Sequence, residues 1–304
     1  MNAAVALNAT RTLSVHRTIN SLRAVRRSLP SHVTVGYVPT MGALHDGHLS
    51  LARQARKNND VVVASVFVNP TQFGEKEDLE KYPRQLERDT SLLDDIGVDH
   101  VFAPDNDIMY GKNHVTYVEA MGFDNIPEGT SRKGHFRGVA TIVTKLLNIV
   151  QPTTAYFGQK DAAQCVLIRR IVEDLNIPVN IEVLDTIRET DGLAMSSRNL
   201  RLTEEERRAV PVIYKSLRAA NDQFSKVMLL SSDTTDPVIS STELISMVYE
   251  ILRSEPLIAE VHYVSVDDKE TMQPITKVNH NGAILSLACQ VGSVRLIDNI
   301  VLSV

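Results

Sequence analysis

Apolar runs of strand length alternate with helix-like segments from Val33 to Arg188, and this alternation restricts the possible folds more than any other feature. It is typical of a parallel sheet covered by helices on both faces. Helical periodicity occurs at 47–57, 86–96, 139–150 and 162–175. The predicted strands are Val33–Val38, Val61–Val68, Val98–Ala103, Ala155–Gly158 and Val179–Asp185. Because right-handed crossovers join parallel strands, we expect a doubly wound, Rossmann-like α/β sheet that binds ligands beyond the carboxyl ends of its strands.

The pattern changes after Arg188, which predicts two domains, at residues 1–187 and 188–304. Three glutamates follow Thr203, as in the first turn of a helix. The stretch Phe224–Ser241 is rich in Ser, Thr and Asp and predicts an exposed loop. Beyond it, one helix and three strand-like runs predict a smaller α+β domain with an antiparallel sheet that forms a lid. These segments are 243–253, 258–266, 283–290 and 293–303.

Composition favours small-molecule chemistry in the cytoplasm. The chain of 304 residues has a formal net charge of -5, which does not suggest a nucleic-acid surface, because neutralising a run of phosphates takes clustered Lys and Arg. Cys165 and Cys289 are far apart in the sequence, so they predict neither a disulfide framework nor a zinc site. No apolar run approaches the roughly 18 residues that a membrane span needs.

The amino-terminal segment contains arginines but no acidic residue before Asp46, a composition that transit peptides share. A structural helix is the stronger interpretation. Apolar residues recur at helical spacing and lead directly into the first predicted strand; they are Val15, Ile19, Leu22, Val25 and Leu29.

The most informative motif, PTMGALHDGH, directly follows the first predicted strand. A strand, a glycine-containing turn at Gly42 and a helix start would present unpaired backbone N–H groups to phosphates. His45 and His48 lie three residues apart, so both could face one polyphosphate and donate hydrogen bonds as charge develops. Metal binding or ordinary packing is the alternative for such a pair. The strand-turn-helix context favours nucleotide binding.

Two further polar clusters follow later strands. In FGQKDAAQ, Gly158 permits close backbone approach, Lys160 supplies a cation for phosphate, and Asp161 could cap the next helix. A single lysine in a loop is usually only solvated, and its proximity to the histidine motif is what favours a role. In LAMSSRN, hydroxyls precede Arg198 at the predicted domain junction, which suits a mobile polyphosphate clamp.

A fourth cluster, FVNPTQFG, ends the second predicted strand with two amides among apolar residues. Buried amides require hydrogen-bonding partners. Asn69 and Gln72, with Gln164 from FGQKDAAQ, could bind a small hydroxy acid while Phe67 and Phe73 pack its methyl groups. For Asn69, satisfying the turn backbone is an equally good interpretation.

Taken together, these motifs resemble the pantoate–β-alanine ligases, members of the nucleotidyltransferase-like superfamily with HxGH and KMSKS-type loops. The similarity runs nearly end to end and includes EGTSRKGHFRGVATIVTKL, TIRETDGLAMSSRN and VRLIDN. The resemblance implies that the carboxylate of pantoate attacks the α-phosphate of ATP, and that β-alanine then displaces AMP from pantoyl adenylate to give pantothenate. It also implies a homodimer.

Site roles follow from the resemblance residue by residue. The catalytic set comprises His45, His48, Lys160, Ser196, Ser197 and Arg198. The remaining ATP contacts are Met41, Gly42, Gly158, Asp161, Ile187 and Met195, while Asn69, Gln72 and Gln164 match the pantoate site. For β-alanine the candidates are Arg132 and His135, with Tyr82 nearby. Mg²⁺ is expected with ATP, and Asp89 is the nearest match for a metal contact.

Two residues depart from the family pattern. Lys133 replaces a usual proline and Ala163 a common glutamine, and neither carries a role in the chemistry. Two other functions compete. Transfer of an adenylyl group to a phosphate acceptor would require extra basic residues where the amides lie. A catalytically idle binding protein would not need intact His45, His48, Lys160 and Arg198.

Overall fold

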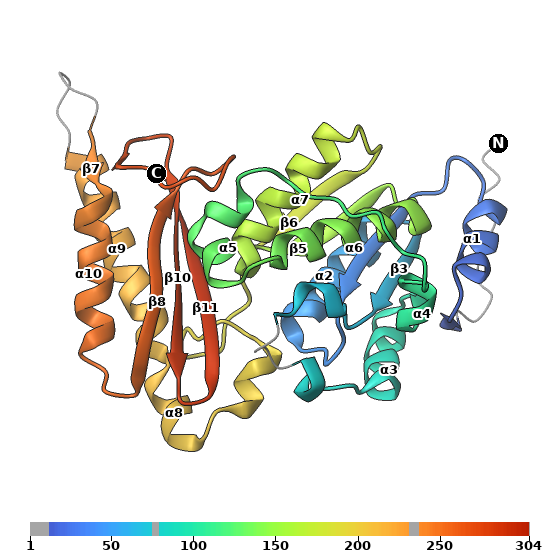
Figure 1. Ribbon diagram of the computed structural model, residues 1–304, viewed down its shortest axis with the longest axis horizontal. Helices are drawn as coiled ribbons and strands as arrows, with labels where there is room; N and C mark the ends of the chain where they lie inside the picture. Colours follow the sequence, from blue (N-terminus) through green and yellow to red (C-terminus); the bar gives the residue numbers. More distant parts are fainter. Residues whose placement is uncertain (1–11, 75–78, 231–236, 304) are drawn as a thin grey trace, which may run out of the picture.

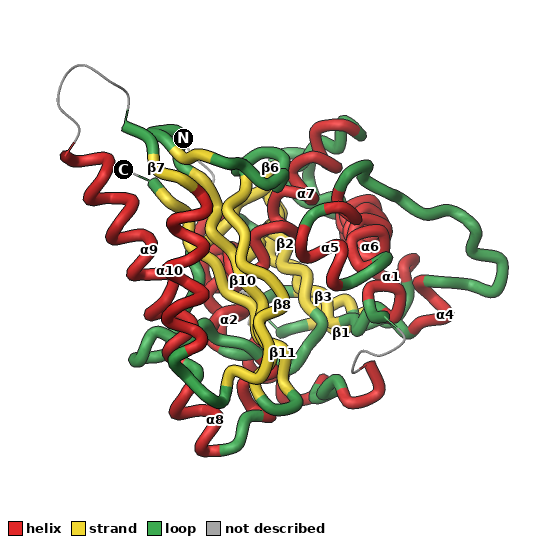
Figure 2. The backbone as a smooth tube through the Cα atoms, turned by 60° about the vertical axis from the view of Figure 1, so that its left-hand side comes forward, coloured by secondary structure: helices red, strands yellow, loops and turns green. Residues whose placement is uncertain are grey.

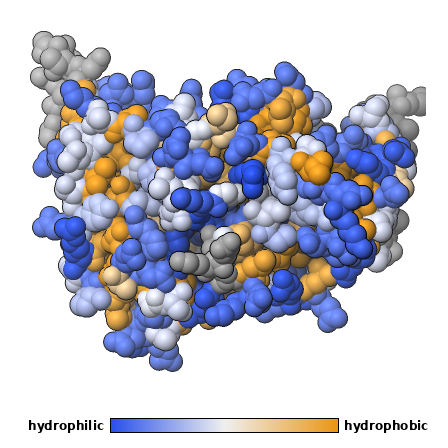
Figure 3. All heavy atoms as spheres, in the orientation of Figure 1, coloured by the Kyte–Doolittle hydropathy of each residue, from blue (hydrophilic) through white to orange (hydrophobic). Residues whose placement is uncertain are grey.

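The computed structural model describes residues 12–74, 79–230 and 237–303. A larger α/β part and a smaller α+β part lie side by side (Figure 1), as the sequence predicts. Among the described residues, no helix is long and apolar enough to span a bilayer. The face drawn in Figure 3 is mostly hydrophilic, and its apolar residues gather in separate patches.

A six-stranded parallel sheet forms the centre of the larger part, in the order β1-β4-β3-β2-β5-β6. Its strands are β1 (Ser14–His16), β2 (Val35–Thr40), β3 (Val61–Val66), β4 (His100–Phe102), β5 (Thr154–Gly158) and β6 (Asn180–Leu184). The chain runs from β2 outward through β3, then returns to add β5 on the other side of β2. The strand order therefore reverses between β2 and β5, where doubly wound sheets bind ligands.

Helices cover both faces of this sheet. Residues of α1, α6 and α7 share one buried apolar cluster, and residues of α2 and α3 contribute to another across the sheet. Their bounds are α1 (Ile19–Ser28), α2 (Asp46–Asn58), α3 (Leu86–Ile96), α6 (His135–Val150) and α7 (Ala162–Asp174). Short helices α4 (Asn106–Met109) and α5 (Pro127–Ser131) lie between α3 and α6 in the chain. The doubly wound arrangement is confirmed.

The first element differs from the prediction. Val15 belongs to β1, whose residues pair with those of β4, and α1 begins only at Ile19. Thr18 stops the helix from extending further back, because its extended backbone and its hydroxyl, which accepts from the N–H of Ser21, form an N-cap. Helical spacing therefore continued by chance into a strand of three residues, and Val15 remains 43% exposed.

The smaller part is built on a three-stranded antiparallel sheet, in the order β11-β10-β8. Helices α9 and α10 pack along it on the side away from the larger part (Figure 2). The elements are α8 (Glu204–Ala209), α9 (Pro211–Leu230), β7 (Ile239–Ser240), α10 (Ser241–Arg253), β8 (Ile258–Asp267), β9 (Lys277–Val278), β10 (Ala283–Val291) and β11 (Val294–Leu302). Each predicted strand and helix after Arg188 is present.

The exposed loop predicted at 224–241 is wrong at both ends. Residues 224–230 belong to α9, and at the far end Ile239 is 2% exposed in β7 and α10 begins at Ser241. Phe224 is fully buried and Met228 is 4% exposed, and both belong to α9 and to the core of the smaller part. Four residues apart, they continue the apolar face of the helix through the polar stretch. Residues 231–236 of the predicted loop lie outside the described residues.

Candidate active site

One pocket at the reversal between β2 and β5 collects nearly all the predicted site residues. Gly42, Phe73 and Asp89 alone among them do not line it. The predicted residues that line it are Met41, His45, His48, Asn69, Gln72, Tyr82, Arg132, His135, Gly158, Lys160, Asp161, Gln164, Ile187, Met195, Ser196, Ser197 and Arg198. Residues from separate loops therefore converge on one cavity.

The two histidines lie at the start of α2. His45 is the N-cap, and its Nδ1 accepts from the N–H of Gly47 at 3.2 Å. His48 Nδ1 accepts from the N–H of His45 at 3.5 Å, and the ring centroids are 4.1 Å apart. Because each Nδ1 is an acceptor, each neutral ring carries its proton on Nε2. This reciprocal capping provides two Nε2–H donors at a helix N-terminus.

Both imidazoles are neutral at physiological pH. Burial, followed by the charge of Lys160, lowers the pKa of His45 to about 4. Burial, followed by the neighbouring His45, lowers the pKa of His48 to about 3. Neutral rings still donate through Nε2–H, so hydrogen bonding to a polyphosphate does not require their protonation.

These lowered pKa values predict a loss of stability in mild acid. Between pH 6.5 and about 4, the unfolded chain binds protons at His45 and His48 that the folded chain does not, so the free energy of unfolding should fall as the pH falls. Denaturant titrations across this range measure the slope. Replacing both histidines by glutamine should flatten it, and an unchanged slope in that variant would contradict the assignment.

Asp89 shapes the loop that precedes His45. Its fully buried carboxylate accepts from the N–H groups of Ala43 at 2.8 Å and Leu44 at 2.9 Å. Gly42 has a φ of 84°, and a Cβ there would lie 2.9 Å from Asp89 Oδ2. The close approach of the carboxylate therefore accounts for Gly42. Metal contact by Asp89 stays a prediction, now beside a structural role that the sequence did not reveal.

A residue of the smaller part hydrogen-bonds to the main chain of FGQKDAAQ around Lys160. Asn299 in β11 donates through Nδ2 to the carbonyl oxygens of Gln159 at 3.0 Å and Lys160 at 2.9 Å. Gln159 donates in return to Asn299 Oδ1 at 3.1 Å. The chain around Lys160 thus depends on an amide 139 residues later, within VRLIDN.

Asp161 is the N-cap residue of α7 by backbone position, but its side chain makes no capping hydrogen bond, so that prediction is wrong. Its carboxylate lies 4.0 Å from Lys160 Nζ instead. Burial acts to raise the pKa of Asp161, but the charges of Lys160 and Arg198 outweigh it and hold the pKa below its ordinary value. An ionised Asp161 therefore faces the cations of the pocket.

The LAMSSRN loop leads into a 3₁₀ turn at Ser197–Arg201. This turn is one of five in the described residues. The others are Pro70–Gln72, Leu79–Lys81, Phe123–Asn125 and Gln159–Asp161. Ser196 caps the turn by accepting from the N–H of Arg198 at 3.2 Å. The N–H of Met195 donates to the carbonyl of Ile187 at 3.0 Å, which fixes the start of the loop beside the end of β6.

The two amides of FVNPTQFG have different surroundings. Asn69 donates to Gln72 Oε1 at 3.0 Å and accepts from Tyr110 at 2.8 Å and Thr71 at 2.9 Å, so its side chain largely stabilises the turn. Gln72 donates through Nε2 to Met41 Sδ at 3.3 Å. Sulfur is a weak acceptor, which makes Gln72 the better ligand donor. Phe67 lines the pocket, whereas Phe73 does not.

Gly138 in α6 allows this loop to approach closely. A Cβ at Gly138 would lie 2.3 Å from the carbonyl oxygen of Thr71, so Gly138→Ala should displace the loop. We expect the free energy of unfolding to fall by about 1–3 kcal/mol. The KM for any substrate that Gln72 binds should rise. Gly111→Ala, where a Cβ has space, is the matched control. Equal stability of the two variants would contradict this interpretation.

Comparisons with known proteins agree with this geometry. Residues 14–301 match the family described as pantoate-beta-alanine ligase. The chain is 48% identical to a pantothenate synthetase of Herpetosiphon aurantiacus over 290 residues, 95% of this chain and 100% of that protein. The chain belongs to the pantoate–β-alanine ligase family.

Solved structures of the family superpose on nearly the whole chain. Pantothenate synthetase from Thermus thermophilus is 42% identical with a TM-score of 0.87, covering 96% of this chain and 100% of that one. The Francisella tularensis ligase, solved with beta-gamma ATP and beta-alanine, is 33% identical with a TM-score of 0.72, covering 95% of this chain and 98% of that one. Of the two departures from the ligase pattern, Lys133 is exposed and Ala163 is half-buried in an adjoining pocket.

Proposed function

We propose that this protein condenses pantoate with β-alanine, using ATP, and releases pantothenate, AMP and pyrophosphate through a pantoyl-adenylate intermediate. The observation that carries the proposal is the convergence of two Nε2–H donors, Lys160 and the Gln72 amide on one pocket. The first three suit a polyphosphate, and the amide suits an uncharged, hydroxylated acid. Membership of the ligase family supports the identity of the substrates.

In the first step, a carboxylate oxygen of pantoate forms a bond to the α-phosphorus of ATP, and the bond from that phosphorus to the bridging oxygen breaks. Pyrophosphate leaves with the bonding electrons. His45, His48 and Lys160 would stabilise the charge on the phosphate oxygens, and Ser196, Ser197 and Arg198 would hold the leaving group. Adenosine would lie against the pocket residues Met41, Gly158, Asp161, Ile187 and Met195.

In the second step, the free amine of β-alanine attacks the acyl carbon, AMP leaves with the electrons of the bond between carbon and oxygen, and the amine nitrogen loses one proton to solvent. Arg132 and His135 would bind the carboxylate of β-alanine. Arg132 Nη1 lies 3.0 Å from His135 Nε2. Gln72, Gln164 and Asn69 would hold the pantoyl group so that the carbonyl faces the amine. Holding both reactants in one pocket makes the step effectively unimolecular.

Mg²⁺ would neutralise the departing pyrophosphate. In the part of the chain that the structure describes, no three His, Cys, Asp or Glu side chains are grouped to hold a metal ion. The residues therefore fit a Mg²⁺ that arrives with ATP and keeps phosphate and water ligands. Family membership also favours a homodimer working in the cytoplasm, which size-exclusion chromatography and cell fractionation would test.

Exchange of labelled pyrophosphate into ATP tests the function. We expect exchange that requires pantoate and Mg²⁺ without β-alanine, followed by AMP release when β-alanine is added. No exchange with pantoate would leave the family assignment standing and overturn the substrate. Transfer of the adenylyl group to a phosphorylated acceptor instead would favour the adenylyltransferase alternative.

A further inference from the structure

Hydrogen bonds and one ion pair connect the smaller part of the molecule to the FVNPTQFG loop through Glu128 and Arg132. Arg295 in β11 donates two bonds to Glu128 in α5, from Nη1 to Oε1 at 3.2 Å and from Nη2 to Oε2 at 2.5 Å. It also donates to the hydroxyl of Ser131 at 3.3 Å. This bidentate pair joins the two parts of the molecule at one carboxylate.

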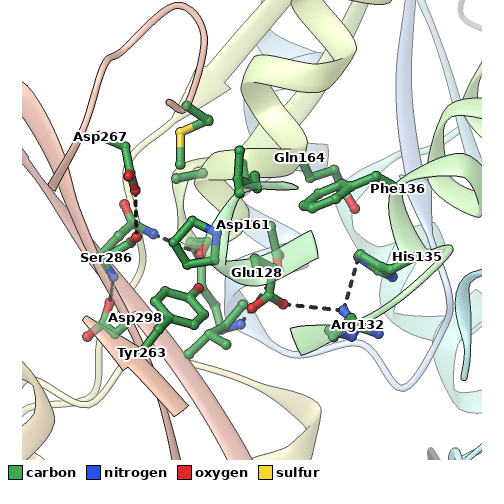
Figure 4. A pocket seen from close by; sticks show the side chains of 18 residues that line it. Glu128, Arg132, His135, Phe136, Asp161, Gln164, Tyr263, Asp267, Ser286 and Asp298 are labelled. Carbon is green, nitrogen blue, oxygen red and sulfur yellow. Dashed lines mark hydrogen bonds and ion pairs between the residues drawn. The ribbon is translucent and has the colours of Figure 1, made fainter. Parts of the chain in front are cut away.

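A second cation, Arg132, lies close to the same carboxylate. Arg132 Nη1 lies 3.6 Å from Glu128 Oε1 and 3.0 Å from His135 Nε2 (Figure 4). Arg132 Nη2 donates to the main-chain carbonyl of Gln72 at 3.4 Å, and His135 Nδ1 lies 2.9 Å from the same oxygen. Three successive side chains thus lead from β11 to the residue proposed to bind pantoate.

The surroundings of Glu128 favour a fixed, ionised carboxylate. Its side chain is 9% exposed, beside 14% for Arg132 and 22% for Arg295. Burial acts to raise the pKa of Glu128, but the hydrogen bond and charge of Arg295, then the charge of Arg132, hold it below the ordinary value. Burial, followed by the charge of Glu128, raises the pKa of Tyr263 in β8, so its phenol stays protonated. A buried charge with several partners has few alternative positions.

We propose that Glu128 is a positioning residue, which holds Arg132 and His135 against the main chain of Gln72 and ties that arrangement to the docking of the smaller part through Arg295. A pair needed only to join the two parts would not require a second arginine that lines the pocket. The inference rests on the proposed function, because it predicts effects on the two acid substrates and none on ATP.

Glu128→Gln keeps the shape of the side chain and removes its charge, so it is the test. We expect the KM values for pantoate and β-alanine each to rise about tenfold or more, the effect of losing one charged hydrogen bond, while the KM for ATP changes less than about twofold. Arg56→Gln is the control: it breaks the buried Arg56–Asp99 pair of the larger part, with 17% and 16% exposed side chains, away from the pocket. It should lower stability and leave all three KM values unchanged.

A double-mutant cycle separates positioning from a general loss of stability. Arg295→Lys should raise the KM for pantoate in the wild type but add little in the Glu128→Gln background, because both changes interrupt one path. If Glu128→Gln does not fold, Arg295→Lys alone provides the test. It should raise the KM values for pantoate and β-alanine and leave the KM for ATP unchanged.

The wild type is measured first. Absence of pantoate-dependent exchange there would overturn the proposed function itself. Exchange in the wild type with unchanged KM values in Glu128→Gln, or with the KM for ATP rising in parallel, would overturn the positioning role alone.

Discussion

Replacing Lys160 with alanine should lower pantoate-dependent pyrophosphate exchange by about a hundredfold to a thousandfold, the typical effect of removing one preorganised group that stabilises transition-state charge. Lys160 lines the pocket with both histidines, and its chain position is fixed by Asn299. The folded structure should change little, because its Nζ lies no closer than 4.0 Å to Asp161. Exchange rates at saturating ATP and pantoate measure the effect.

Lys57→Ala is the matched control, since Lys57 is an exposed lysine in the last turn of α2. It should retain wild-type exchange. A thermal midpoint for Lys160→Ala close to that of the wild type would exclude misfolding as the cause. If Lys160→Ala exchanged pyrophosphate within about threefold of the wild-type rate, Lys160 would not stabilise the transition state, and the idle-binding alternative would regain support.

The fold follows from the sequence because its periodicities are strong and local. The predicted bounds of α3 are those observed, and the end of that helix is marked by Gly97 with a φ of 87°. The strand β1 escaped prediction because its three residues are held by pairing with β4, far along the chain, rather than by any pattern of their own. Phe224 was wrongly assigned to a loop because the polar residues around it dominate the composition of that stretch. Its burial in the core of the smaller part shows that it belongs to the apolar face of α9.

The site was predictable where function is carried by loops at strand ends, because parallel topology alone brings those loops together. The supporting residues were not predictable. Asn299, Glu128 and Arg295 act through contacts between segments 139 and 167 residues apart, and no spacing in the sequence signals such contacts. Asp89 is a further case, because a carboxylate in a helix looks the same in a sequence whether it binds a metal or backbone N–H groups.

Changing Asp89 to asparagine separates those two roles. The amide would turn one acceptor into a donor that faces the N–H of Ala43 or Leu44, inside a site with no exposure to water. We expect the free energy of unfolding to fall by about 2–4 kcal/mol, the cost of losing one charged hydrogen bond and leaving a buried donor unpaired. Urea denaturation at pH 7 measures it. Exchange activity should fall as well, because residues 41–44 lead directly into His45.

A magnesium titration provides the contrasting outcome. If Asp89 acted mainly as a metal ligand, Asp89→Asn would keep wild-type stability and regain activity at high Mg²⁺ concentration. If Asp89 anchors the loop, the variant should be destabilised, and excess Mg²⁺ should not restore exchange. Asp95→Asn, an exposed carboxylate on the same helix, should match the wild type in both measurements. The geometry favours the role of Asp89 as an anchor of the loop. Each carboxylate oxygen already accepts a hydrogen bond from a backbone N–H of the loop, and a metal-bound carboxylate would leave those N–H groups unpaired.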